Sequence, residues 1–351
     1  MGIYWLMFLI PILGSVRSYK VGYDVKFISN LFFIVFFSIL IGFRYKVGGD
    51  WDSYAYMHSA YDIYDVGQTN FLHNDFLYFV LIALSNQLNL DVWFPNLICG
   101  LILVTGVVAF CNQQRHYYLA LLICVPYLFI VVGMGYSRQA AAIGFVFFAV
   151  SLLHNKKVFL FLLAIFFGSL FHKSCLIVVP FGLMAISSNK KIFFFLGSLF
   201  IVLGIVTYSQ ISEAVQNYIG DRVNESRGAL IRVVLSVLPS VLILRYHRVL
   251  LKGLSTKDFW RYFSLVPLFA LPLVPFASNL TDRLLLYTIP IQAFCFSRLD
   301  LLFNDYLNKQ LINFVVVFIY FLVMFIWINF SAHSSYWIPY RSFLFSRPGM
   351  E

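Results

Sequence analysis

Long apolar runs, separated by short polar or charged clusters, follow one another along the whole chain. A helix needs about 20 apolar residues to cross a bilayer, and somewhat fewer when charged ends reach the interface or the bilayer thins. The pattern therefore predicts an all-α polytopic membrane protein with about twelve transmembrane helices, forming one integral membrane domain over residues 1–351. The runs lie near residues 3–16, 28–43, 93–111, 117–134, 139–153, 158–171, 174–187, 192–208, 229–246, 260–277, 284–300 and 311–329.

Composition agrees with this class. Hydrophobic residues make up 61% of the chain and charged residues 11%, whereas soluble domains carry about 25% charged residues. The first apolar run has no basic residue before Arg17, so we expect a retained helix rather than a cleaved signal peptide. The five cysteines lie in or beside apolar runs at unrelated spacings, which predicts packing residues rather than a disulfide framework.

Lysine and arginine positions predict the orientation. The basic clusters at 17–26, 112–116, 154–157, 187–191, 245–257 and 304–309 alternate correctly if all of them face the cytoplasm. That side then carries 15 Lys and Arg against 4 Asp and Glu, and the outer side carries 10 against 11. The surplus positive charge is thus a topology signal, and no nucleic-acid partner is predicted from it.

Three outer segments follow from this orientation. Residues 44–92 become a large outer loop, because an odd number of crossings must separate its start from the cytoplasmic cluster at 112–116. The short run 76–88 ends in polar residues and is predicted as an interfacial helix within that loop. Residues 209–228 form a smaller outer loop, and residues 330–351 form an outer C-terminal tail.

The two sides also differ in the kind of base. Nine of the eleven lysines are predicted inside, whereas eight of the ten outer basic residues are arginine. Arginine's planar fork suits bidentate binding of phosphate and carboxylate. The outer face is therefore predicted to bind an anionic ligand.

The stretch "GFRYKVGGDWDSY" is the first of four polar sites at outer helix ends. Arg44 follows a span, two glycines allow a tight turn, and Asp50 and Asp52 come next. The alternative for these carboxylates is a helix N-cap. The D-x-D spacing alone predicts no metal site, because no histidine or further acidic cluster accompanies it.

Two more sites follow at neighbouring outer ends. Arg138 and Gln139 open a helix, where an arginine opposes the helix dipole and needs an anionic partner, either one of the two carboxylates or a bound phosphate. His172 and Lys173 lie in a very short turn between two runs. The alternative for His172 is an interfacial hydrogen-bonding residue.

The fourth site is "SNLTDRLLLYTIP". Arg283 begins a helix and Tyr287 lies one turn further along the same face. Arg232 adds a charge inside a span, and such charges mark candidate functional sites. Carboxylates, arginines, a histidine and a tyrosine on one face suit transfer from a phosphate-activated, lipid-anchored donor, and no cofactor is predicted.

At these residues the chain resembles the EpsG family of bacterial exopolysaccharide, O-antigen and capsule polymerases of the Wzy type. The shared motifs read Gly42/Arg44…Gly48/Asp50…Tyr54, Arg138-Gln139, Phe171-His172-Lys173-Ser174 and Arg283…Tyr287. Asp75 stands where the family often has a glutamate. The resemblance covers roughly residues 40–290.

The resemblance implies polymerisation of undecaprenyl-pyrophosphate-linked oligosaccharide repeat units at the outer face of the bacterial inner membrane. It also implies a GT-C-like glycosyltransferase architecture without metal, and it leaves a chain-length regulator as a candidate partner beside the lipid bilayer. Asp50 or Asp52 is the hypothetical general base or the carboxylate that orients the acceptor. The remaining predicted site residues bind pyrophosphate or position sugar and phosphate oxygens: Arg44, Tyr54, Arg138, Gln139, His172, Lys173, Arg232, Arg283 and Tyr287.

Three other functions remain open. An O-antigen ligase would use the same donor but usually carries a larger late outer loop. A membrane O-acyltransferase would take its acyl donor from the cytoplasmic side, opposite to His172. A lipid-oligosaccharide flippase would be expected to have two matching halves and a polar central cavity, and the sequence indicates neither.

Overall fold

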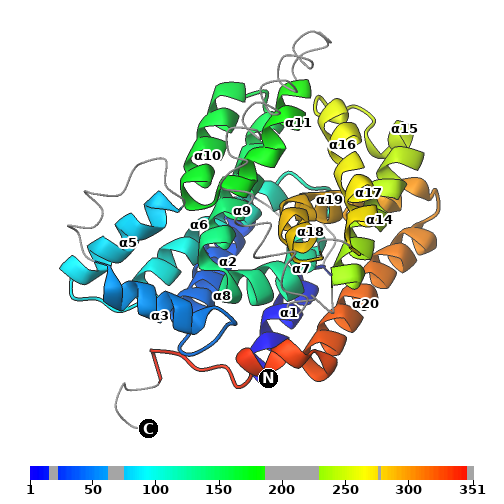
Figure 1. The fold of residues 1–351 in the computed structure, drawn as a ribbon. Helices are drawn as coiled ribbons and strands as arrows, with labels where there is room; N and C mark the ends of the chain where they lie inside the picture. Colours follow the sequence, from blue (N-terminus) through cyan, green and yellow to red (C-terminus); the bar gives the residue numbers. More distant parts are fainter. Residues whose placement is uncertain (16–22, 62–74, 186–228, 276–277, 346–351) are drawn as a thin grey trace.

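The computed structural model describes residues 1–15, 23–61, 75–185, 229–275 and 278–345. Figure 1 shows the helices up to α11 (blue to green) on one side of the molecule and α14 to α20 (yellow to red) on the other. The first helices are α1 (Gly2–Ser15), α2 (Tyr23–Gly42), α3 (Trp51–Ala60), α5 (Phe76–Gln87) and α6 (Trp93–Cys111). Next come α7 (Tyr117–Cys124), the π-helix η1 (Val125–Val132), α8 (Gly133–Gly135), α9 (Ser137–His154), α10 (Val158–Phe171), η2 (Lys173–Val178) and α11 (Val179–Met184).

The later helices are short, except α14 and α20. They are α14 (Ala229–Arg245), α15 (His247–Leu250), α16 (Lys257–Phe263), α17 (Leu265–Ala270), η4 (Leu271–Leu273), α18 (Ser278–Leu285), η5 (Leu286–Thr288), α19 (Ile289–Phe296), η6 (Leu299–Leu302), α20 (Tyr306–Phe330) and η7 (Ala332–Tyr336). Extended pairing within the described residues is limited to one antiparallel bridge, between Arg44 and Ser342.

Helices α6 and α9 form the centre of the fold. A side chain at Gly106 of α6 would collide with the backbone of Gly144 in α9, so glycines let the two helices approach closely, as is common between membrane helices. Between 61 and 89% of the residues in the spans of α6, α7 to α8, and α9 are buried, against 28% for α2 and 22% for α20. The apolar faces of α2 and α20 are therefore left for lipid.

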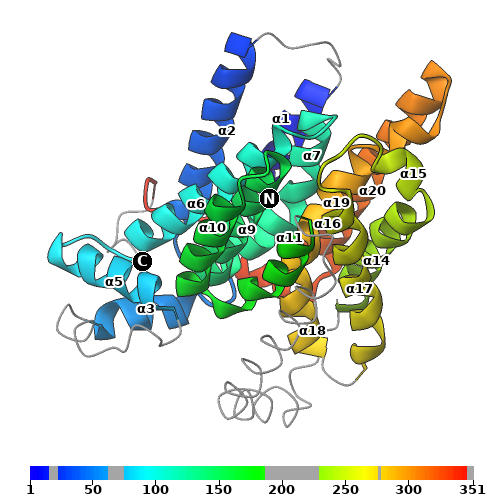
Figure 2. The same cartoon turned by 90° about the horizontal axis from the view of Figure 1, so that it is seen from above.

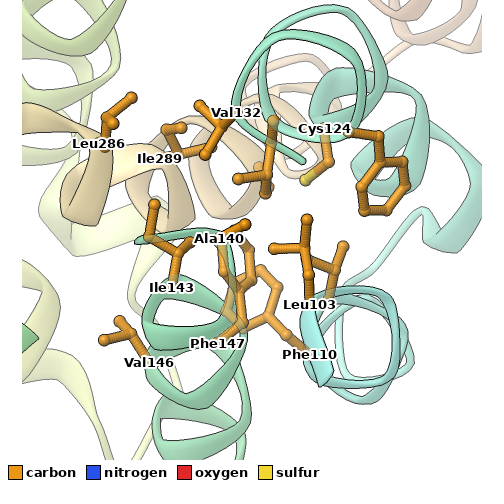
Figure 3. Close-up of a cluster of buried hydrophobic side chains, with 14 of the residues drawn as sticks. Leu103, Phe110, Cys124, Val132, Ala140, Ile143, Val146, Phe147, Leu286 and Ile289 are labelled. Atoms are coloured by element: carbon orange, nitrogen blue, oxygen red, sulfur yellow. The ribbon is translucent and has the colours of Figure 1, made fainter. Parts of the chain in front are cut away.

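The buried core joins the two sides of the molecule. Figure 3 shows Leu103 and Phe110 of α6 and Phe147 of α9 in one apolar cluster with side chains of α7 and η1. Leu286 and Ile289 approach the same cluster from the C-terminal side. This packing fixes the position of the α18 to α19 region against the start of α9.

The helical membrane class is confirmed. Five helical segments among the described residues are long and apolar enough to cross a bilayer. The predicted run 260–277 is divided into α16, α17 and η4, and 284–300 into α18, η5 and α19. Pro267 and Pro290 lie within these stretches, and proline removes a backbone donor from a helix. The run 192–208 and the loop 209–228 lie outside the described residues.

Contacts at one end of the bundle agree with the predicted sidedness. Nζ of Lys26 donates to the carbonyl of Asn112 at 3.1 Å, and Oγ of Ser255 donates to the carbonyl of His154 at 3.2 Å. These pairs join loops that were all predicted to be cytoplasmic. Figure 2 shows the start of α2 and the start of α20 toward this end, with α3 and α18 toward the other.

The C-terminal tail runs across the opposite end. The amide of Tyr45 donates to the carbonyl of Arg341 at 3.0 Å, and the amide of Gly48 donates to the carbonyl of Tyr336 at 2.9 Å. The indole of Trp337 donates to the carbonyl of Ile130 at 3.0 Å. The tail therefore holds the loop between α2 and α3 against the bundle, a contact that no sequence pattern indicates.

Candidate active site

Arg44 is the anchor of the loop between α2 and α3. Its side chain is 0% exposed, and its guanidinium donates to the carbonyls of Ile41 and Val47 at 2.7 and 3.2 Å. The same group donates to Oδ1 of Asn96 at 3.0 Å and to Oγ of Ser137 at 2.7 Å. The sequence predicted that Arg44 binds a ligand. Because protein groups surround its guanidinium completely, Arg44 instead positions the loop of the site.

A glycine turn carries the chain from Arg44 to Asp50. Gly48 has φ +107°, and a side chain there would meet the carbonyl of Met134. Only glycine combines this conformation with so close an approach to another backbone. The turn places Asp50 directly before α3, where its carboxylate makes no capping hydrogen bond to the helix.

Asp50 faces the arginines of the other helix ends. Burial raises the pKa of its carboxyl above the usual value, while the charges of Arg283, Arg138 and Arg44 act in the opposite direction. A carboxylate with a raised pKa in a site rich in arginine is a candidate proton acceptor. Asp52 is exposed in the first turn of α3, so the structure favours Asp50 over Asp52 as the base.

Arg138 has the anionic partner that its position requires. Its guanidinium lies 2.5 Å from Oδ2 of Asp75, which is 8% exposed. The guanidinium carbon also lies 5.7 Å from the centre of the Tyr54 ring, and Tyr54 contacts Tyr78 with ring centres 5.4 Å apart. The sequence proposed Asp50, Asp52 or a phosphate as the partner, whereas the structure uses Asp75.

His172 and Tyr287 meet across the site. The Tyr287 hydroxyl lies 3.3 Å from Nδ1 of His172, and the amide of Ser174 approaches the same nitrogen at 3.4 Å. An amide can only donate, so Nδ1 accepts and the ring proton of the neutral histidine belongs on Nε2. Burial lowers the pKa of His172, with Asp75 opposing the shift, so the ring is neutral at pH 7.

The neighbouring residues Asp282 and Arg283 contact different parts of the molecule. Asp282 forms a bidentate pair with Arg232, with N to O distances of 2.5 and 2.8 Å. The guanidinium carbon of Arg283 lies 5.9 Å from the centre of the Tyr136 ring, and Gln139 donates to the carbonyl of Arg283 at 2.9 Å. Gln139 therefore holds α18 in place, whereas the sequence assigned it to a ligand.

Most predicted site residues converge on one end of the bundle. Lys173 follows His172 at the start of η2 and is partly exposed there. Sequence reasoning missed Asn96 and Ser137, the side-chain partners of Arg44. Asn96 carried a signal, because it is a polar residue within a predicted span.

In the part of the chain that the structure describes, no group of three or more His, Cys, Asp or Glu side chains is placed to hold a metal ion. The site instead combines a proton acceptor, several guanidinium groups and a neutral His–Tyr pair. Such a set can accept a proton from a hydroxyl and stabilise charge on a departing phosphate.

The fold and the site define a class of protein: a helical, multi-pass membrane protein with a polar arginine and carboxylate site at one end of its bundle. The EpsG family model matches residues 27–342, and the chain belongs to the EpsG family. The match confirms the family that the motifs indicated. No curated protein and no solved structure matches the chain.

Proposed function

We propose that the protein is a Wzy-type polysaccharide polymerase that joins lipid-linked oligosaccharide repeat units. The observation that carries this proposal is the placement of Asp50, with its raised pKa, among Arg283, Arg138 and Arg44. Membership of the EpsG family supports the polymerase class. The donor is an oligosaccharide on undecaprenyl pyrophosphate, and the acceptor is the terminal sugar of a second lipid-linked unit.

In the proposed reaction, an acceptor hydroxyl attacks the anomeric carbon of the donor sugar. The new glycosidic C–O bond forms as the C–O bond to the pyrophosphate breaks, and the hydroxyl proton passes to the carboxylate of Asp50. Arg138 and Arg283 stabilise the charge on the departing polyprenyl pyrophosphate. The neutral pair of His172 and Tyr287 orients sugar hydroxyl groups.

The proposal includes the inner membrane of a bacterium, with the site on its outer face. It also includes about twelve crossings and a GT-C-like arrangement. The clustered residues at the ends of α2, α9, α10 and α14, together with the opposite set of basic loops, support that sidedness. A chain-length regulator is a proposed protein partner.

The gel pattern of surface polysaccharide in a strain lacking the gene tests the function. Complementation with wild type should restore a ladder of polymer, and complementation with Arg138→Ala should leave single repeat units attached to the lipid core. The Arg138→Ala protein must be present in the membrane in a normal amount. A normal ladder without the gene would overturn the proposal.

The same gel separates the alternatives. Complete loss of attached repeats, including single units, would indicate a ligase or a flippase. A full ladder lacking only a substituent would indicate an acyltransferase. Each of these patterns contradicts a polymerase.

A further inference from the structure

A second feature lies beside the arginine site. A partly open cavity of about 370 Å³ is lined by residues of η1, α14, the α18 to α19 region and α20. Its walls are mostly apolar, with Leu235 contributed by α14 and Val323 by α20. Ile326 and Phe330 also border it and are exposed on α20, the helix whose outer face is left for lipid.

The buried polar side chains of this cavity, Ser236, Gln292 and Tyr320, hydrogen-bond to one another. The amide of Gln292 donates to Oγ of Ser236 at 3.0 Å, and the hydroxyl of Tyr320 donates to Oε1 of Gln292 at 2.8 Å. Buried polar groups that are already paired gain little from a polar ligand. The interior therefore suits an apolar occupant.

One charged pair stands at the wall of the cavity. The Arg232–Asp282 pair lines it together with Tyr127, whose ring centre lies 5.4 Å from the Arg232 guanidinium carbon. The next residue after Asp282 is Arg283, whose charge acts on Asp50. One short helix, α18, thus links the charged site to the apolar cavity.

We propose that this cavity binds the first isoprene units of the lipid-linked substrate while the pyrophosphate lies at the arginine site. The inference rests on the proposed function and deepens it, because it assigns a place to the hydrocarbon chain. An anionic head group beside guanidinium groups, continuous with an apolar chain, matches the arrangement of charge and apolar surface around α18. The aliphatic chain enters between α14 and α20 from the lipid-facing side.

The test fills the cavity without touching the charged site. Leu235→Trp places an indole in the cavity, and Leu238→Trp is the matched control, because Leu238 lies on the same helix, is 45% exposed and is not part of the cavity wall. Val323→Trp fills the cavity from the opposite wall if the first variant unfolds. Thermal unfolding of each purified protein checks that it is folded.

The probes are undecaprenyl diphosphate, inorganic diphosphate and phosphatidylglycerol, with binding to the purified full chain in nanodiscs measured by native mass spectrometry. Wild type and Leu238→Trp should bind undecaprenyl diphosphate about tenfold or more tightly than inorganic diphosphate, because the isoprene units bury apolar surface. Leu235→Trp should lose that preference and keep its affinity for inorganic diphosphate.

Two results would overturn the inference. One is an unchanged preference for the long chain in both folded cavity variants. The other is displacement of undecaprenyl diphosphate by an equal concentration of phosphatidylglycerol, which would assign the cavity to membrane phospholipid. The assay requires no turnover, so a chain that binds as expected and does not polymerise would contradict the proposed function alone.

Discussion

Two carboxylates at opposite ends of the bundle, Asp50 (partly buried) and Asp300 (buried), lie beside similar residues and differ in the direction of their pKa shifts. At the cytoplasmic end, both oxygens of Asp300 accept from Nε of Arg115 at 2.9 and 2.8 Å, and Nε2 of His116 lies 3.2 Å away. Burial alone would raise the pKa of Asp300, but these hydrogen bonds and charges lower it overall. At the outer end, the charges around Asp50 do not compensate for its burial, and its pKa is raised.

The difference is one of hydrogen bonding rather than of composition. Asp300 has donors at bonding distance, so its charge is satisfied and it has no remaining role for a substrate. No described residue lies within ion-pair distance of Asp50, although three arginines act on it. A carboxylate left in this state can take up a proton during a reaction, whereas a satisfied one stabilises the fold.

After loss of the Asp50 carboxylate itself, the largest effect is expected from Arg283→Gln. Loss of one charge that stabilises a leaving group typically lowers the rate about 10²–10³-fold, and Arg283 is the charge acting most strongly on Asp50. Polymerisation by purified enzyme measures this effect. Arg261→Gln, an exposed arginine at the other end, is the control and should keep the rate within about twofold. Equal rates in both variants would remove Arg283 from the mechanism.

Gly48→Ala should lower polymerisation strongly without removing the protein from the membrane. The substitution forces a side chain toward the carbonyl of Met134 at a positive φ, a strain of about 1–3 kcal/mol that displaces Asp50. Gly49→Ala is the matched control, because a Cβ atom added at Gly49 would lie 3.7 Å from its nearest neighbour, the ring of Trp337. Similar polymer yields from the two variants would contradict the close-packed turn.

Arg44→Lys should lower stability even though it keeps the charge. Lysine cannot reproduce the fork that joins two carbonyls, Asn96 and Ser137, and each buried group left unsatisfied costs about 1–3 kcal/mol. The midpoint of thermal unfolding in detergent should fall clearly below that of wild type. An unchanged midpoint with reduced substrate binding would instead place Arg44 in the ligand site.

The pH dependence of the rate should reflect Asp50. A base must be deprotonated, so activity should rise with pH, and the acid limb should lie above the usual carboxyl pKa of about 4 because burial raises the pKa of Asp50. Initial rates with saturating substrate across the acidic range measure the limb. A limb at the ordinary carboxyl value would show that another group controls the reaction.

The smallest effect is expected from Asp52→Asn. Asp52 is exposed on α3, so polymer length and amount should remain within about twofold of wild type. The gel ladder of the complemented strain measures both. A loss as large as that of the arginine variants would restore Asp52 as a candidate base.

Periodicity and charge could predict much of this molecule. The runs that became α6, α9 and α20 are long, apolar and bounded by polar clusters, so their length alone defines them. The run 260–277 could not be predicted correctly in this way, because hydropathy measures apolar content and does not show where a chain with proline will break its helix. The short helices α16 and α17 that replace it pack against α14.

The sequence located candidate residues at the outer helix ends but could not show which of them pair with one another. Arginines and carboxylates at outer helix ends could be located from the sequence, and the structure brings Asp50 and Arg138 to one end. The pairing of Arg138 with Asp75 and the burial of Arg44 depend on how the helices cross. The contact of the tail through Trp337 left no periodic signal at all.

The central claim is that Asp50, which forms no ion pair with a described residue, performs chemistry, whereas Asp300, which is paired with Arg115, does not. The direct measurement compares Asp50→Asn and Asp300→Asn as purified proteins, using the rate of polymerisation of a lipid-linked repeat unit per folded molecule. Asp50→Asn should fold normally and lose about 10²–10⁴ in rate, whereas Asp300→Asn should unfold at a lower temperature and keep its rate. A wild-type rate for folded Asp50→Asn would contradict the account.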